Sequence, residues 1–98
     1  MLTISSQRYL DLETVEAKRA EADYVVGYIE LELEGVEYRV VVDGHHSLAA
    51  ANLDGVEPQW DRAQMSQDDA GALGAQAWLE AHEIDDSWYD MATGVAVF

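Results

Sequence analysis

The chain has 98 residues, of which 49% are hydrophobic, and its 20 acidic and 5 basic side chains give a formal net charge of −15 at pH 7. This length fits one small domain with a single modest core. Because the chain contains no cysteine, disulfides, thiolate zinc sites and thiol-based redox chemistry are excluded. The charge also argues against direct nucleic-acid binding, since that affinity comes from Lys and Arg side chains that neutralise phosphates.

The same composition bears on the protein's location and surface. No apolar run approaches the ~20 residues of a membrane span, and the first residues lack the basic and then apolar character of a signal peptide. We therefore expect a cytoplasmic protein without membrane contact. The hydrophobic fraction is too high for an acidic disordered tail, which places the charge on a folded surface. Such a surface either serves solubility or salt adaptation, or imitates a nucleic acid.

The first elements expected in chain order are a short strand and a helix. Residues 2–5 alternate in hydrophobicity, which indicates an edge strand. Asp11 is a suitable N-cap for a helix that has Glu13 in its first turn. Lys18 and Arg19 lie near the end of this helix, where positive charge complements the helix dipole.

Residues 24–33 and 36–42 are predicted to form a β-hairpin around a tight turn at Glu34-Gly35. Apolar and acidic residues alternate, so one face belongs to the core and the other carries a carboxylate row, formed by Glu30, Glu32 and Glu34 with Glu37 near the turn. Side chains two apart on a strand lie ~6.6 Å apart, about twice the ~3.4 Å rise per phosphate along one DNA strand. The row is either a partner-binding surface or an ordinary solvated β face.

Residues 40–52 form the joint around which we expect the chain to be organised. Three successive valines favour a buried strand, Asp43-Gly44 favours a tight turn, and the alanine-rich residues 47–52 favour a helix that stops at Asp54-Gly55. A strand, a turn and a helix N-terminus together form an anion site, because the first backbone N–H groups of the helix are unpaired. Phosphate is the natural ligand of such a site.

The residues of this joint resemble a known motif. Asp43-Gly44-His45-His46, followed by Leu48-Ala49-Ala50, resembles the D-G-H-H-R-x-x-A signature of the ParB/sulfiredoxin-like superfamily. The resemblance covers roughly residues 2–60 and implies a small α+β domain with a mixed β-sheet and packed helices. It also implies that Gly44, His45, His46 and Ser47 lie beside a nucleotide phosphate. Ser47 stands where the family usually has arginine, so a hydroxyl replaces a group that clamps phosphate bidentately.

The C-terminal part is predicted to add an acidic helix and a closing strand. Residues 56–60 favour a short strand at a sheet edge, because they include Pro58, and residues 61–67 are polar and irregular. Asp68-Asp69 then opens a helix over residues 70–81, and residues 94–98 form a short apolar strand. Between residues 63 and 98 there are seven acidic residues and no Lys or Arg.

Asp43, His45 and His46 are the candidate catalytic residues. One imidazole is placed to hydrogen-bond a phosphate oxygen at the helix N-terminus, while Asp43 fixes the tautomer of the other. The alternative is structural: Asp43 caps the helix and a histidine packs on Trp60. Because the rings of adjacent histidines diverge and His82 is distant in the sequence, we expect no metal site.

Trp88 and Tyr89 lie among acidic residues, which include Asp85 and Asp86. These aromatic residues either belong to the core or form an interface, in which they anchor a basic partner that the acidic residues steer. Together with the carboxylate row they make up the predicted partner-binding set. A homodimer through this C-terminal segment is a further alternative.

We thus expect one α+β domain over residues 1–98, and two functions remain open. The first is an acidic binding protein or inhibitor, encoded by a phage or mobile element, that uses no cofactor. It would block a basic nucleic-acid-binding partner, such as a restriction or CRISPR effector, by mimicking nucleic acid. The second is a nucleotide-phosphate hydrolase or kinase that uses the DGHH turn, a nucleotide and Mg²⁺. Whether the chain is an enzyme is left open.

Overall fold

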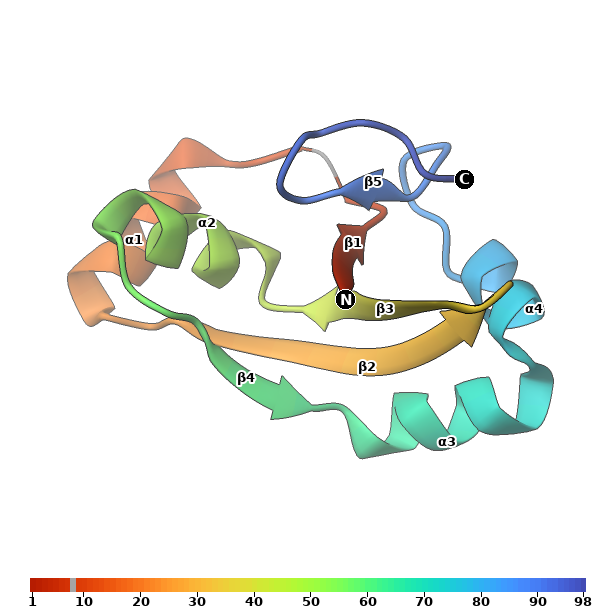
Figure 1. The fold of residues 1–98 in the computed structure, drawn as a ribbon. Helices are drawn as coiled ribbons and strands as arrows, with labels where there is room; N and C mark the ends of the chain where they lie inside the picture. Colours follow the sequence, from red (N-terminus) through yellow and green to blue (C-terminus); the bar gives the residue numbers. More distant parts are fainter. Residues whose placement is uncertain (8) are drawn as a thin grey trace.

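The structure is a computed structural model that describes residues 1–7 and 9–98. Its elements in chain order are β1 (Leu2–Ser5), α1 (Leu12–Glu21), β2 (Val25–Leu33), β3 (Val36–Asp43), α2 (His45–Asp54), β4 (Gln59–Arg62), α3 (Gln64–Leu73), α4 (Ala75–Ala81) and β5 (Tyr89–Asp90). The strands form one sheet in the order β4-β2-β3-β1-β5 (Figure 1). β1 and β4 run parallel to their inner neighbours, whereas β2 and β3 are antiparallel. The predicted α+β class with a mixed sheet is confirmed.

The central hairpin of β2 and β3 forms as its sequence predicts. Glu34 and Gly35 have φ values of 53° and 79°, and this pair of left-handed residues lets a two-residue turn follow the twist of the strands. Leu33 pairs with Val36 directly beside the turn. Near the far end the register shifts between Gly27 and Tyr28, so β3 holds one extra residue there.

Successive side chains of a strand point to opposite faces, so this sheet has two apolar surfaces. The main core lies between one face and the α3–α4 side of the molecule, and it comprises Ile4, Ile29, Leu31, Tyr38, Val40, Ala70, Trp78, Leu79 and Trp88. A smaller cluster of Val26, Val41 and Leu48 lies on the other face, where α2 covers the sheet. The rest of that second face, toward the hairpin turn, carries polar side chains.

α1 and α2 lie side by side at the end of the sheet where β2 begins and β3 ends (Figure 1). Asp11 caps α1 as predicted, since its Oδ1 accepts the Glu13 N–H at 3.1 Å. Arg19 Nε and the Tyr24 hydroxyl both donate to Asp54 at 2.7 Å, which ties the two helices together. None of the helices in the described residues is long and apolar enough to cross a membrane.

Three predicted elements in the C-terminal part are wrong. The segment expected to be irregular, residues 61–67, contains the end of β4 and the start of α3, so Asp68-Asp69 lies inside a helix instead of opening one. The helix expected over residues 70–81 is interrupted at Gly74, whose φ of 96° ends α3. The expected closing strand at residues 94–98 makes one isolated bridge, between Ala96 and Tyr89. Polar composition misled the first prediction, because the amide of Gln67 hydrogen-bonds both backbone groups of Glu30.

The first prediction concerns Gly44, where α2 begins. A Cβ at Gly44 would lie 2.5 Å from the Val25 carbonyl oxygen, and the φ of 79° is one that side chains rarely adopt. Gly55 shares the positive φ but has open space around it, so it is a matched control. We expect Gly55→Ala to lower the free energy of unfolding by about 1 kcal/mol and Gly44→Ala by about 3 kcal/mol or more. Urea unfolding followed by circular dichroism measures both values, and equal losses would contradict the close approach.

Candidate functional site

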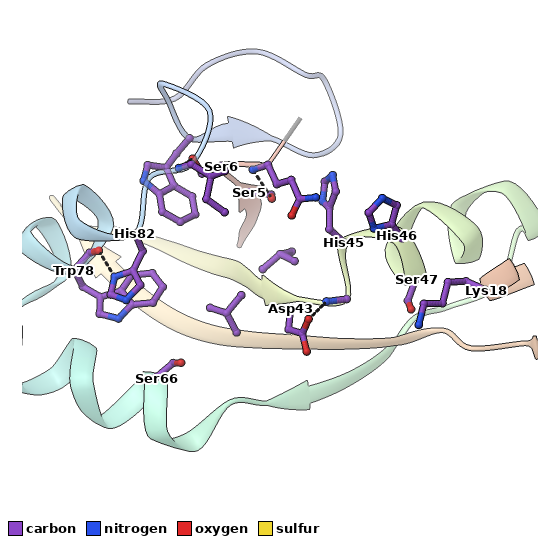
Figure 2. Close-up of a pocket in the computed structure, with 16 residues that line it drawn as sticks. Ser5, Ser6, Lys18, Asp43, His45, His46, Ser47, Ser66, Trp78 and His82 are labelled. Carbon is purple, nitrogen blue, oxygen red and sulfur yellow. Dashed lines mark hydrogen bonds between the residues drawn. The ribbon is translucent and has the colours of Figure 1, made fainter. Parts of the chain in front are cut away.

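A pocket of about 440 Å³ lies at the edge of the sheet where the neighbouring parallel strands β1 and β3 both end (Figure 2). The carboxyl ends of parallel strands are where α/β proteins commonly bind ligands. Residues from both strand ends, from α1, α2, α3 and α4, and from the loop after α4 meet there, among them Ser5, Ser6, Lys18, Asp43, Gly44, His45, His46, Ser47, Ser66, Trp78 and His82. The structure therefore brings all four residues of the DGHH turn to one cavity.

The helix that follows the turn begins at the pocket. α2 starts at His45, two residues earlier than predicted, and its N-cap is Gly44 with no side-chain hydrogen bond to the first turn. Asp43 does not cap the helix, because its Oδ1 accepts the N–H of Gly44 itself at 2.8 Å. The first-turn N–H groups of α2 are therefore left without a side-chain acceptor, which is the arrangement an anion needs.

His45 is the most unusual side chain of the pocket. It is 8% exposed, and both of its ring nitrogens are shielded from water and have no hydrogen-bond partner among residues 1–7 and 9–98. Burial lowers the pKa of His45, and the neighbouring His46 lowers it further, while Asp85 acts weakly in the opposite direction. The imidazole is therefore neutral near pH 7, and it offers one donor and one acceptor to a bound group.

His46 is held differently. Its Nε2 accepts the N–H of Asp11 at 3.1 Å, so this ring links α2 to the start of α1. The His45 and His46 rings are 6.0 Å apart between centroids and inclined at 77°, so they diverge as predicted. In the part of the chain that the structure describes, Asp43 forms no hydrogen bond with either ring, and no group of three or more potential ligands could hold a metal ion.

Ser47 and Lys18 lie at the α1 side of the pocket mouth. Ser47 is buried, and the Lys18 ammonium hydrogen-bonds Asp23 at 2.9 Å. The Lys18 contact is the main reason that the pKa of Asp23 is lowered, and the same contact raises the pKa of Lys18. A cation from another helix thus lies near the position where the motif usually places arginine. Sequence reasoning missed this role of Lys18, since nothing in the spacing predicts it.

His82 and Trp78 form the opposite wall, on α4 and just after it. The Nδ1–H of His82 donates to the Trp78 carbonyl at 2.8 Å, because a carbonyl can only accept, and Nε2 is left as an acceptor. The two rings stack at 4.1 Å between centroids. Trp78 is 2% exposed, and its indole N–H has no partner. Neither histidine of the DGHH turn stacks on Trp60, which packs edge-on against Tyr28 instead.

The predicted partner-binding residues are divided between exposed and buried positions. Glu32, Glu34, Glu37 and Asp86 are exposed, whereas Glu30 pairs with Arg62 at 2.9 Å. Trp88 is 3% exposed and its indole N–H donates to the Leu79 carbonyl. Its ring therefore belongs to the core, and its predicted place on a partner-binding surface is wrong. The Tyr89 hydroxyl donates to the Asp85 carbonyl. The hairpin turn and the C-terminal segment nevertheless meet, since Glu34, Trp88 and Phe98 line a hollow of about 190 Å³.

Comparison with models of known protein families, with curated proteins and with solved structures finds no match to this chain. The pocket, the distribution of charge and the residues of the DGHH turn are therefore the features that indicate a function.

The second prediction follows from the unpartnered imidazole of His45. A buried polar group without a hydrogen bond costs about 1–3 kcal/mol, so we expect His45→Phe to raise the free energy of unfolding by roughly that amount at neutral pH. Because burial lowers the pKa of His45 in the folded protein, the unfolded chain takes up this proton first as the pH falls below about 6.5. The advantage of His45→Phe over the wild type should therefore grow between about pH 7 and pH 5.

Urea unfolding at several pH values measures this difference between the two proteins. His46→Phe is the matched control, because it removes an existing hydrogen bond from the Asp11 N–H and should not raise the free energy of unfolding. Destabilisation by His45→Phe at every pH would show that the ring nitrogens have partners in the native protein.

Proposed function

We propose that this chain is a binding domain for a small phosphate-bearing ligand, held at the N-terminus of α2. The observation that carries the proposal is His45, a buried imidazole in the wall of the pocket whose two nitrogens have no partner in the part of the chain that the structure describes. Buried polar groups are almost always satisfied, and an exception in a cavity is explained most simply by a ligand that satisfies it. The resemblance of the DGHH turn to the ParB/sulfiredoxin-like motif supports a nucleotide as that ligand, with Mg²⁺ as a companion ion.

The charges around the turn support an anionic ligand despite the net charge of the chain. The uncapped N–H groups of α2 carry partial positive charge, and the Lys18 ammonium, which is paired with Asp23, lies at the same mouth. Two carboxylates near the turn are engaged, because Asp23 is paired with Lys18 and Asp43 accepts from the Gly44 N–H. A volume of about 440 Å³ lies within the usual range for small-molecule sites.

The geometry supports binding more directly than catalysis. Hydrolysis or phosphoryl transfer by the DGHH turn needs a histidine base that a neighbouring carboxylate orients. In the described residues Asp43 is not hydrogen-bonded to either histidine of the turn, so it does not have that role here. The imidazole best prepared to accept a proton is His82, since Nδ1 is fixed on the Trp78 carbonyl and Nε2 is left as acceptor. Any enzymatic activity would therefore depend on His82 as well as on the predicted catalytic residues Asp43, His45 and His46.

The third prediction tests the binding proposal by calorimetric titration. We expect saturable binding of ATP or CTP, with or without Mg²⁺, and a loss of at least about tenfold in affinity for Lys18→Met because a charge-assisted hydrogen bond is removed. His45→Phe should abolish measurable binding while keeping the fold. Asn52→Ala, an exposed change late in α2, is the matched control and should bind as the wild type does. Titration with inorganic phosphate separates recognition of phosphate from recognition of the rest of the ligand.

Two outcomes would contradict the proposal. Absence of saturable binding for all three ligands would leave the pocket without a phosphate role. Binding that survives His45→Phe unchanged would place the ligand elsewhere on the protein.

A second candidate function is an acidic binding protein that blocks a basic nucleic-acid-binding partner. The observation that favours it is the cross-strand pair Glu32 and Glu37, which are exposed and lie directly opposite each other in the hairpin. Like charges in that arrangement are destabilising, so their placement suggests a role outside folding. Glu34 at the adjacent turn extends the same negative surface, whereas Glu30 is partly neutralised by Arg62.

The fourth prediction tests this candidate with the amide changes Glu32→Gln, Glu34→Gln and Glu37→Gln combined in one protein. The assay is displacement of a fluorescent DNA duplex from purified restriction and CRISPR effector nucleases. If the acidic surface competes with DNA, the triple variant should displace it less and with a flatter salt dependence, because fewer ion pairs form. Asp68→Asn, Asp69→Asn and Glu80→Gln on α3 and α4 remove the same charge elsewhere and should change little. Equal loss in both variants would indicate a general charge effect.

A further inference from the structure

The open part of the sheet's second face gathers basic and aromatic side chains that neither function above uses. They lie on three adjacent strands (Figure 1): Tyr28 on β2, Arg39 on β3, and Trp60 and Arg62 on β4. Tyr28 and Trp60 pack edge to face at 5.8 Å between ring centroids. The Arg62 guanidinium lies 5.5 Å from the Tyr28 ring centre and pairs with Glu30. We call these four residues the basic end of the open face.

Arg39 is the central residue of the basic end. Its guanidinium lies 4.3 Å from the Trp60 ring centre and 5.7 Å from that of Tyr28. Its Nε is shielded from water and has no hydrogen-bond partner within the described residues. Lys18, Arg19 and Arg62 all form ion pairs, whereas no ion pair of Arg39 is found in the described residues. In a chain with 20 acidic residues, an arginine held on aromatic rings without a carboxylate is prepared to receive one from outside.

The other end of the same face carries the matching charge. Glu32 and Glu37 form the next pair on this face after Glu30 and Arg39, two pairs nearer the hairpin turn in the ladder. They lie directly opposite each other, and neither forms an ion pair within the described residues. Side chains two apart on a strand are ~6.6 Å apart, so the basic and acidic ends lie next to each other. The open face is therefore polarised along the strands.

We propose that the open face binds a second copy of this chain, in a two-fold symmetric dimer whose sheets face each other. A two-fold axis that lies in the plane of the interface, perpendicular to the strands and between the two ends of the face, places Arg39 of each copy against Glu37 of the other. An interface of this kind must be self-complementary, and a face with one basic and one acidic end meets that condition. The contact gives Arg39 a carboxylate and relieves the repulsion between Glu32 and Glu37 twice in each dimer.

The composition of the face sets the expected strength. Trp, Tyr and Arg are the side chains that most often dominate interface energy, and here they are adjacent at the basic end of the face. The face is only three strands wide, so we expect it to bury less than the ~800 Å² per partner of a standard interface and to give a dissociation constant on the order of micromolar. Repulsion between two copies of charge −15 is screened beyond ~8 Å at physiological ionic strength, whereas contacting pairs are not.

Sedimentation velocity over a range of protein concentrations tests the dimer, with charge reversal as the decisive step. Arg39→Glu and Glu37→Arg should each give a monomer, because every Arg39–Glu37 contact then joins like charges. An equimolar mixture of the two variants should dimerise again, since both contacts then join opposite charges. Asp69→Arg makes a charge change of the same size on α3 and should leave the dimer intact. Circular dichroism establishes that each variant is folded.

A wild-type monomer at high concentration would overturn the proposal, as would a dimer that survives both charge reversals. Failure of the mixture to restore the dimer would overturn the assigned pairing. If Arg39→Glu does not fold, Glu37→Arg, at an exposed position near the turn, still decides between monomer and dimer. The pocket at α2 lies outside this face, so ligand binding by the monomeric variants tests the proposed function separately.

Discussion

The close approach of Gly44 to the backbone of β2 is the constraint on which the rest of the structure depends. With no side chain and a φ of 79°, Gly44 lets the chain leave β3 and enter α2 within one residue, against the Val25 carbonyl. That short connection brings the N-terminus of α2 to the sheet edge where β1 also ends. The pocket exists because those three elements meet there, and α4 closes it from the opposite side.

Much of this joint could be predicted from the sequence, because local chemistry determines it. Each part of the joint has a sequence that favours one local conformation. The three valines favour a strand, Asp43-Gly44 a turn, the alanines a helix and Gly55 a left-handed C-cap, and the structure has all four. The hairpin at Glu34-Gly35 was predictable for the same reason. The identification of DGHH as a phosphate turn depends on resemblance, and it remains a proposal.

What the sequence could not predict is which distant side chains share the pocket. Lys18 and His82 are separated by most of the chain, and only the packing of α1 and α4 brings both to the same cavity. Composition was misleading for residues 61–67, whose polar side chains predicted an irregular segment. There the side chain of Gln67 hydrogen-bonds the backbone of Glu30 in place of a neighbouring strand, and the segment contains the start of a helix. Trp88 shows the converse, since acidic neighbours suggested exposure but its indole N–H has a buried carbonyl as partner.

The distribution of charge reconciles a strongly acidic chain with a pocket suited to an anion. Long-range repulsion acts on the approach of a ligand, but affinity is decided within the first few ångströms, where screening by salt is weak for partly buried groups. At the pocket mouth the carboxylates of Asp23 and Asp43 are already hydrogen-bonded, Asp23 to Lys18 and Asp43 to the Gly44 N–H. The N-terminus of α2 and the imidazole of His45, which has no partner among the described residues, lie close by. The hairpin end of the molecule has the reverse arrangement, with exposed carboxylates on neighbouring strands. Net charge therefore describes the surface as a whole, and the function of each site depends on which charges are already paired.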